Sequence, residues 1–180
     1  MAVYVSMLRA VNVGGHNRIK MAELRELYAS LGFTGAQTHL QSGNAVFATP
    51  ERSAAKLREK IEAAIERRFG LRPRVLVRTA AQLRSAVDRF PFAGADLDPG
   101  HLLVVFLAAA PDAAARTALA AYTGPEQVCL EGTELFVHYC NGIGRSRLTT
   151  AWIEKTLKTE GTGRNLRTLG ALLEMAQALE

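Results

Sequence analysis

The chain has 180 residues, of which 48% are hydrophobic and 22% are charged. This balance excludes a disordered protein and leaves enough apolar residues for a sizeable core. Lys and Arg number 22 against 17 Asp and Glu, which gives a formal net charge of +5. Such an excess favours anionic partners, although it also serves solubility.

Cysteine usage and hydropathy indicate a cytoplasmic protein. The two cysteines, Cys129 and Cys140, form no CxxC pair, and reduced thiols are expected. The N-terminus lacks the basic region and cleavage site of a signal peptide. The longest apolar run, Leu102–Pro111, is far shorter than the ~20 residues needed to span a bilayer, so no membrane partner is expected.

The first half of the chain, residues 1–92, predicts the element order β-α-β-β-α-β. That order is typical of the split β-α-β arrangement of a ferredoxin-like sheet. Apolar residues at helical spacing follow Met21, and Thr49-Pro50-Glu51 is expected to open the second helix. Strands are expected at residues 3–11, 36–41, 44–48 and 73–77, with a tight turn at Ser42-Gly43.

The second half, residues 93–180, predicts the order β-α-β-β-α with two C-terminal helices. A capping box at Thr79–Gln82 opens the helix that leads into the expected boundary at Phe92–Gly100. A GTG link is expected to separate the last two helices, at residues 148–159 and 166–179. The whole chain is therefore expected to be an α+β protein with two similar halves.

Three polar loops of the first half are predicted to share one end of the sheet. Their glycines would let backbone N–H groups approach an anion, and their guanidinium and amide groups are forked donors. Asn, Gly and Ser also simply make turns. The expected platform consists of Arg9, Asn12, Gly14, Gly15, Asn17, Arg18 and Lys20, of Gln41, Ser42, Gly43 and Asn44, and of Arg72 and Arg74.

A second basic cluster is predicted at two helix N-termini in the last third. Cations at a helix N-terminus are disfavoured by roughly 0.3–1 kcal/mol, so an anion or a protein carboxylate is expected beside them. Arg145 and Arg164 are therefore expected to lie near a shared anion, with salt bridges to Glu131, Glu134 or Glu154 as the alternative. The candidate ligand residues are Arg145, Ser146, Arg164, Asn165 and Arg167.

Motifs for metal, nucleotide or nucleophilic chemistry are missing from the sequence. The first loop, VNVGGHNRIK, matches neither the P-loop nor the dinucleotide-binding pattern. His138 and Cys140 lack a third ligand nearby, and no GxSxG elbow occurs. His16 is the one weak candidate for acid–base catalysis. No metal or cofactor is expected.

Three segments resemble a known family: LRAVNVGGHNRIKMAELRELYASLGF, HLQSGNAVF and NGIGRSRLTTAWIEKTLKTEGTGRNLRTLGALLEM. In order and spacing they are similar to the signature segments of domain-of-unknown-function family 1697. The resemblance implies a bacterial cytosolic protein with a two-part α+β fold, and it implies no catalytic residues. Leu166 is a departure, since family members tend to have an aromatic residue there.

The leading hypothesis is a protein that binds a phosphate-bearing anionic ligand, namely a nucleotide, a phosphometabolite or nucleic acid. Aromatic residues make up only 7% of the chain, which weakens the single-stranded nucleic acid version. An enzyme acting on a small phosphorylated or carboxylated metabolite through His16, or a protein-assembly module, is the alternative. The sequence indicates no oligomeric state.

Overall fold

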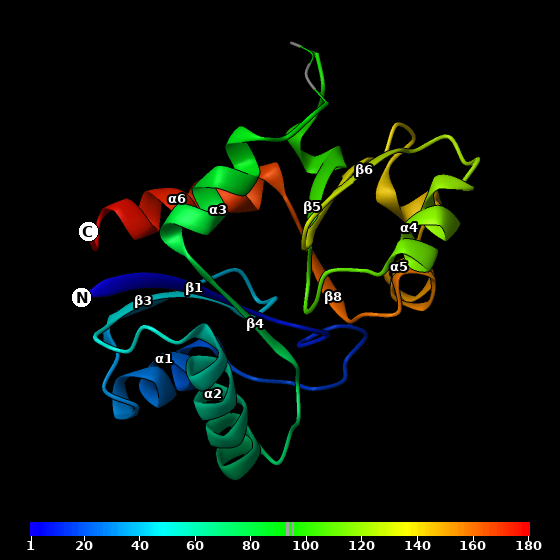
Figure 1. Cartoon of the computed structure of the whole chain (residues 1–180). Coiled ribbons are helices and arrows are strands. Elements are labelled where there is room, and N and C mark those ends of the chain that lie inside the picture. The colour runs from blue at the N-terminus through cyan, green and yellow to red at the C-terminus, as the bar shows by residue number, and fades with distance from the viewer. Residues whose placement is uncertain (93, 95) are drawn as a thin grey trace. The chain divides into compact units, whose positions relative to one another are not determined.

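The computed structural model describes residues 1–92, 94 and 96–180 (Figure 1). These residues divide into two compact units, Met1–Ser85 with Gly170–Glu180, and Ala86–Leu169. Two residues of the expected boundary at Phe92–Gly100, numbers 93 and 95, lie outside the described residues. The predicted α+β class with two similar halves is confirmed.

The first unit is built on a four-stranded sheet in the order β2-β3-β1-β4, and every neighbouring pair is antiparallel. The chain order β-α-β-β-α-β is the predicted one. Its elements are β1 (Ala2–Leu8), α1 (Met21–Ser30), β2 (Thr34–His39), β3 (Asn44–Thr49), α2 (Ala54–Phe69) and β4 (Val75–Thr79), followed by α3 (Ala80–Asp88).

Two helix starts in this unit show how local residues decide the boundaries. The capping box before α3 is confirmed, since Thr79 N donates to Gln82 Oε1 at 2.9 Å and Gln82 N donates to Thr79 Oγ1 at 3.1 Å. The predicted start of α2 at Thr49 is wrong, because Thr49 is still paired with Ala2 in the sheet. Ser53 caps α2 instead, accepting from the backbone N–H of Lys56.

One face of the first sheet packs against α1 and α2 (Figure 1). Phe47 of β3 lies in the middle of this core, with its ring centroid 4.3 Å from Phe33 and 5.4 Å from Tyr28. The hydroxyl of Tyr28 lies 2.9 Å from Ser6 Oγ, so both buried hydroxyls have a hydrogen-bond partner. Burial raises the pKa of Tyr28 far above its ordinary value, and this phenol stays protonated.

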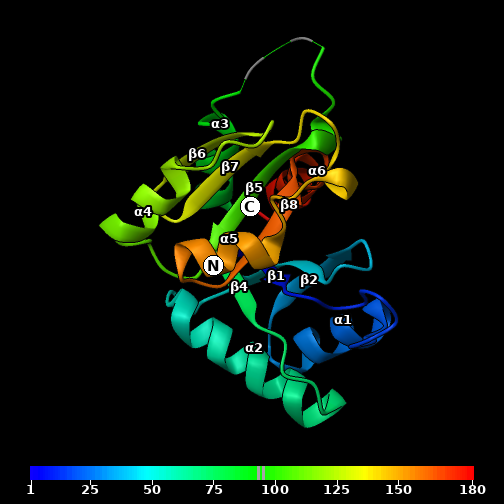
Figure 2. The ribbon, with the colours of Figure 1, turned by 90° about the vertical axis from the view of Figure 1, so that its right-hand side faces the viewer.

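The second unit repeats this topology, with an antiparallel sheet in the order β6-β7-β5-β8. One face of it packs against α4 and α5 (Figure 2). The elements are β5 (Leu102–Leu107), α4 (Ala113–Ala120), β6 (Gln127–Glu131), β7 (Glu134–His138), α5 (Thr150–Leu157) and β8 (Gly161–Asn165), with short 3-10 turns at Pro99–His101 and Ile143–Arg145. The last helix, α6 (Leu166–Gln177), begins in this unit, and its residues from Gly170 on belong to the first unit.

The GTG segment is a strand and not the link that the sequence predicts. It forms β8, in which Thr162 pairs with Phe106 and Gly163 with Val105. A Cβ on Gly161 would lie 3.0 Å from the side chain of Leu107, so the missing side chains let β8 approach β5 closely. Each half therefore reads β-α-β-β-α-β followed by a helix.

In the part of the chain that the structure describes, no helix has both the length and the apolar character needed to cross a bilayer.

Candidate functional site

The end of β1 joins the three polar loops of the first unit. The backbone N–H of Leu8 donates to the carbonyl of Gly43 in the β2–β3 hairpin at 3.0 Å. The next residue, Arg9, donates its N–H to the carbonyl of Arg74, in the loop before β4, at 2.9 Å. The first loop, the hairpin and the α2–β4 loop therefore meet at one end of the sheet.

Asn12 holds the first loop and the hairpin together. Its Nδ2 donates to the carbonyls of Ile19 at 2.9 Å and Gln41 at 2.7 Å, and its Oδ1 accepts from the N–H of Ile19 at 2.9 Å. The amide that the sequence assigned to a ligand is thus used inside the protein. Asn12 is a framework residue, and its polarity satisfies backbone groups that the loop would otherwise leave unpaired.

Asn17 and Asn44 have the same kind of role. Asn17 Nδ2 donates to the carbonyl of Ala10 at 3.2 Å. Asn44 is fully buried, and its Nδ2 donates to the carbonyl of His39 at 2.9 Å and to Ser42 Oγ at 3.0 Å. The asparagines shape the two loops, and neither Asn44 nor Asn12 offers its Nδ2 to a ligand.

The Gly14-Gly15 pair forms a tight turn that brings Arg18 beside it. Both glycines have positive φ, 59° and 81°, and His16 N donates to the carbonyl of Val13 at 3.1 Å, as in a type I′ turn. A Cβ on Gly15 would lie 3.7 Å from Arg18 Nη2. His16 and Arg18 are exposed, and their side chains make no hydrogen bond or ion pair with any residue that the structure describes.

Backbone strain is concentrated in these two loops. In the described chain, five residues other than glycine have positive φ, and only Lys158, which ends α5, lies elsewhere. For a non-glycine residue this conformation costs roughly 1–2 kcal/mol, less for asparagine. Strained residues of this kind cluster at functional sites. The four are Ala10, Asn12, Asn17 and Leu40.

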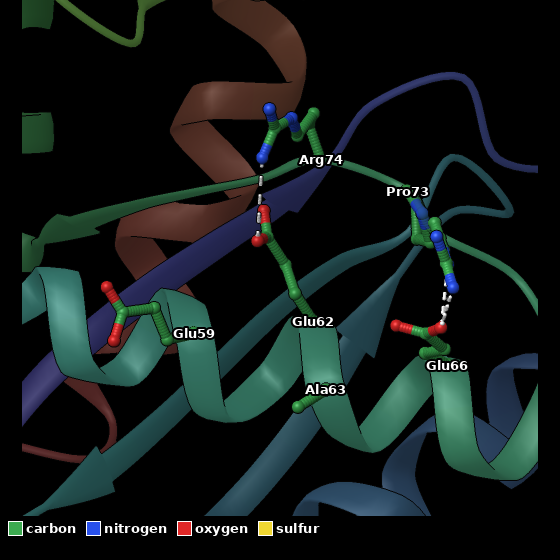
Figure 3. A pocket seen from close by; sticks show the side chains of 7 residues that line it. Glu59, Glu62, Ala63, Glu66, Pro73 and Arg74 are labelled. Carbon is green, nitrogen blue, oxygen red and sulfur yellow. Dashed lines mark hydrogen bonds and ion pairs between the residues drawn. The ribbon is translucent and has the colours of Figure 1, made fainter.

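Arg72 and Arg74 of the third loop are turned toward carboxylates of α2. They line a pocket of about 490 Å³ with Glu59, Glu62 and Glu66 (Figure 3). Arg72 Nε donates to Glu66 Oε1 at 2.6 Å, and Arg74 Nη1 lies 3.9 Å from Glu62 Oε2. Because each guanidinium faces a carboxylate, this loop adds little free positive charge to the platform.

The remaining two loops, residues 9–20 and 39–44, are here called the basic loop site. Residues 1–22 and 27–50 contain no Asp or Glu, so no acidic residue lies within either loop. The corresponding loops of the second sheet, 108–112, 131–133 and 158–160, contain Asp112, Glu131 and Glu160 against the one cation Lys158. The fold therefore does not require a basic end, and the positive charge of the first unit needs another reason.

The predicted second cluster is organised differently from the prediction. Arg164 lies in β8 and is buried, and its Nη1 donates to Thr162 Oγ1 at 2.7 Å and to the carbonyl of Gly163 at 2.9 Å. Burial lowers the pKa of Arg164 to about 10. Asn165 Oδ1 accepts from the N–H of Thr168 at 2.8 Å and so caps α6.

A carboxylate stands beside Arg167, as the alternative reading of this cluster expected, but it is Asp98. Arg167 Nη2 lies 3.0 Å from Asp98 Oδ1. Hydrogen bonding from the N–H of Gly100, with a smaller contribution from Arg167, lowers the pKa of the Asp98 carboxyl. Arg145 is exposed in its 3-10 turn. The anion site shared by Arg145 and Arg164 stays a prediction.

Ser146 belongs to a buried carboxylate centre that the sequence did not indicate. Ser146 Oγ and the hydroxyl of Tyr122 each donate to one oxygen of Glu126, which is 8% exposed. Burial alone would raise the pKa of Glu126, but the two hydrogen bonds outweigh it and the pKa is lowered. The glutamate thereby ties the loop before β6 to the loop before α5.

In Glu126→Gln, the free energy of unfolding is expected to depend less on pH in the acidic range than in the wild type. The pKa of Glu126 in the folded protein lies below the unfolded value of ~4.3. The contribution of the ionised carboxylate to the free energy of unfolding is therefore complete above about pH 5, and it is lost as the pH falls through the folded pKa. Urea unfolding should show a loss of about 1–2 kcal/mol at pH 7 that shrinks toward pH 3. Glu59→Gln, at an exposed position, is the control. A pH-independent difference would contradict the assignment.

The residues described include no group of three or more His, Cys, Asp or Glu arranged to hold a metal ion. His138 and Cys140, the pair that the sequence singled out, do lie together, with Nδ1 and Sγ 3.6 Å apart. His138 Nδ1 also lies 2.9 Å from Gln127 Oε1.

Comparisons with known proteins agree with the fold. The solved structure of the conserved bacterial protein SP0830 from Streptococcus pneumoniae is similar, with 20% identity, a TM-score of 0.74, and coverage of 97% of this chain and 98% of that chain. No curated protein matches the chain. The family model described as "Protein of unknown function (DUF1697)" matches residues 1–136, which include the whole basic loop site. The chain therefore belongs to the DUF1697 family of proteins of unknown function.

Proposed function

We propose that the protein binds a phosphate-bearing anionic ligand at the basic loop site. The observation that supports this most is Arg18, an exposed guanidinium without a partner among the described residues, held beside the Gly14-Gly15 turn. Arg9 and Lys20 add positive charge at the same end, where neither loop contains an acidic residue. The ligand classes that fit are a nucleotide, a phosphometabolite and nucleic acid.

The framework around Arg18 suits a binding site. A guanidinium on a flexible loop loses much of its binding energy to ordering, whereas one on a pre-organised loop loses less. Here Asn12 and Asn17 fix the loop on both sides of the turn through hydrogen bonds to its own backbone. Arg18 would then meet phosphate oxygens with two parallel N–H donors.

Binding is favoured over catalysis because of the surroundings of His16. A catalytic imidazole usually needs a second group that orients it, such as a carboxylate or a carbonyl. No described residue forms a hydrogen bond or ion pair with the His16 side chain, which is exposed. His16 is better placed as one more donor to an anion.

The proposal predicts that Arg18→Ala weakens the specific binding of phosphate compounds. We expect pyrophosphate, nucleoside monophosphates or sugar phosphates to raise the melting temperature of the wild type, and Arg18→Ala to weaken that affinity about tenfold to a hundredfold, as for a charge-assisted hydrogen bond. Arg52→Ala is the matched control, since Arg52 is exposed just after the opposite end of β3. Equal loss in both variants, or no stabilisation of the wild type, would overturn the proposal.

Labelled oligonucleotides at two salt concentrations test the nucleic acid version. If Arg18 contacts a phosphate, the log–log salt dependence of duplex binding should become shallower by about 0.9 in Arg18→Ala. No binding at low salt would exclude nucleic acid and leave the small phosphorylated ligands.

A further inference from the structure

Two exposed aliphatic side chains lie within the basic loop site. Val13 is 64% exposed in the first loop and Leu40 is 56% exposed in the hairpin. Their neighbours in sequence, Asn12 and Gln41, are joined by a 2.7 Å hydrogen bond, so the two loops are held side by side at this point. Among described residues the other large hydrophobic side chains with such exposure are Met1 and Ile143.

The turn conformation does not favour a leucine at position 40. Its φ is +59°, a conformation in which a bulky residue is an outlier and which Gly or Asn adopts at less cost. Since more than half of the Leu40 side chain is exposed, burial within the unit offsets little of that cost. Strained residues whose cost is not offset by packing are typical of ligand-binding sites, so Leu40 is a candidate for contact with a ligand.

Single exposed hydrophobic residues are common on protein surfaces and need no explanation. Val13 and Leu40 differ from that background because they lie on the two loops of the basic loop site, which also contains Arg18 and has no acidic residue in either loop. The basic loop site therefore presents exposed apolar side chains as well as the Arg18 guanidinium.

We infer that the ligand of the basic loop site is a phosphomonoester with an apolar substituent, whose phosphate meets Arg18 and whose apolar part contacts Val13 and Leu40. The inference rests on the proposed function and specifies its ligand class. It predicts that affinity increases with the apolar surface of the substituent at constant charge, because each methylene group that is fully buried adds about threefold to fourfold.

Isothermal titration with inorganic phosphate, methyl phosphate and hexyl phosphate tests this directly. The wild type should bind hexyl phosphate at least about tenfold more tightly than methyl phosphate, which allows for partial burial of the chain. Adenosine monophosphate in the same series separates the two sources of such a ligand. Binding tighter than that of hexyl phosphate indicates a nucleotide, and weaker binding indicates an alkyl ester.

The variant Leu40→Asn distinguishes a role of Leu40 in ligand contact from a role in the stability of the fold. Asparagine tolerates positive φ better than leucine, so the variant should melt at a higher temperature than the wild type while losing the preference for hexyl over methyl phosphate. Val13→Ser should reduce the same preference, and Ile143→Ser, at an exposed residue of the second unit, should leave it unchanged.

The outcomes distinguish this inference from the function on which it rests. If the wild type binds methyl and hexyl phosphate equally, or if Leu40→Asn keeps the preference, the apolar contact is wrong and anion binding at Arg18 stands. If none of the phosphates binds, both are overturned.

Discussion

We expect Gly43→Ala to lower the free energy of unfolding by about 3 kcal/mol, through two separate effects. Gly43 has a φ of +75°, where an added side chain costs roughly 1 kcal/mol or more. A Cβ there would also lie 2.9 Å from Leu8 Cβ, and Leu8 is only 1% exposed and cannot move away freely. Overpacking of this kind costs about 1–3 kcal/mol.

Gly70→Ala is the matched control for Gly43→Ala. Gly70 ends α2 with a similar φ of +67°, but an added Cβ would meet no atom within 4 Å. Gly70→Ala should therefore lower the free energy of unfolding only by the cost of the positive φ, about 1 kcal/mol. Urea unfolding of both variants gives the difference, which measures the contact between the hairpin and β1. Equal losses would mean that the hairpin shifts to accommodate the added methyl group, and that it is not held rigidly against Leu8 of β1.

Much of the fold could be predicted from the sequence because neighbouring residues decide where many helices begin and end. The capping box at Thr79 and the left-handed glycine after α2 are visible in the residue types alone. β8 was missed because its residues, GTGRN, have poor strand propensity, and glycines in that position suggested a link. What makes them a strand is the close approach to β5, a tertiary requirement that no local pattern contains.

The location of the basic loop site could be predicted, but not the roles of its residues. The topology and the absence of acidic residues were both readable from the sequence. Asparagine, however, serves a turn and a ligand equally well, and only the coordinates reveal that Asn12 and Asn44 bond to backbone carbonyls. Leu40 was expected within a strand to Gln41, whereas β2 ends at His39 and Leu40 takes positive φ.

The Glu126 centre was missed for a similar reason. Tyr122 and Glu126 are four residues apart in a loop rather than a helix, and Ser146 is distant in sequence. A Cβ on Gly124 would clash with the ring of Tyr122, so a glycine between them is needed for the tyrosine to reach the carboxylate. The order of residue types gives no sign of that geometry.

Asn12→Ala is expected to lower the free energy of unfolding by about 3 kcal/mol and to weaken phosphate binding by up to the factor expected for Arg18→Ala. The variant loses three hydrogen bonds, at about 1 kcal/mol each, and places alanine at a φ of +56°. The backbone N–H of the buried residue Ile19 is left without its acceptor. Arg18, one residue earlier, would then no longer be held beside the glycine turn.

Asn17→Ala isolates the effect of that framework from the effect of backbone strain. Asn17 has nearly the same φ, +51°, but its side chain makes one exposed hydrogen bond, of 3.2 Å, to Ala10. It should lose about 1–1.5 kcal/mol and keep most of its affinity for phosphate compounds. Amide hydrogen exchange should rise across residues 12–20 and 39–43 in Asn12→Ala, because Asn12 joins the two loops, and only in the first loop in Asn17→Ala. If both variants behave alike, the hydrogen bond from Asn12 to Gln41 does not couple the loops, and Arg18 is positioned by the first loop alone.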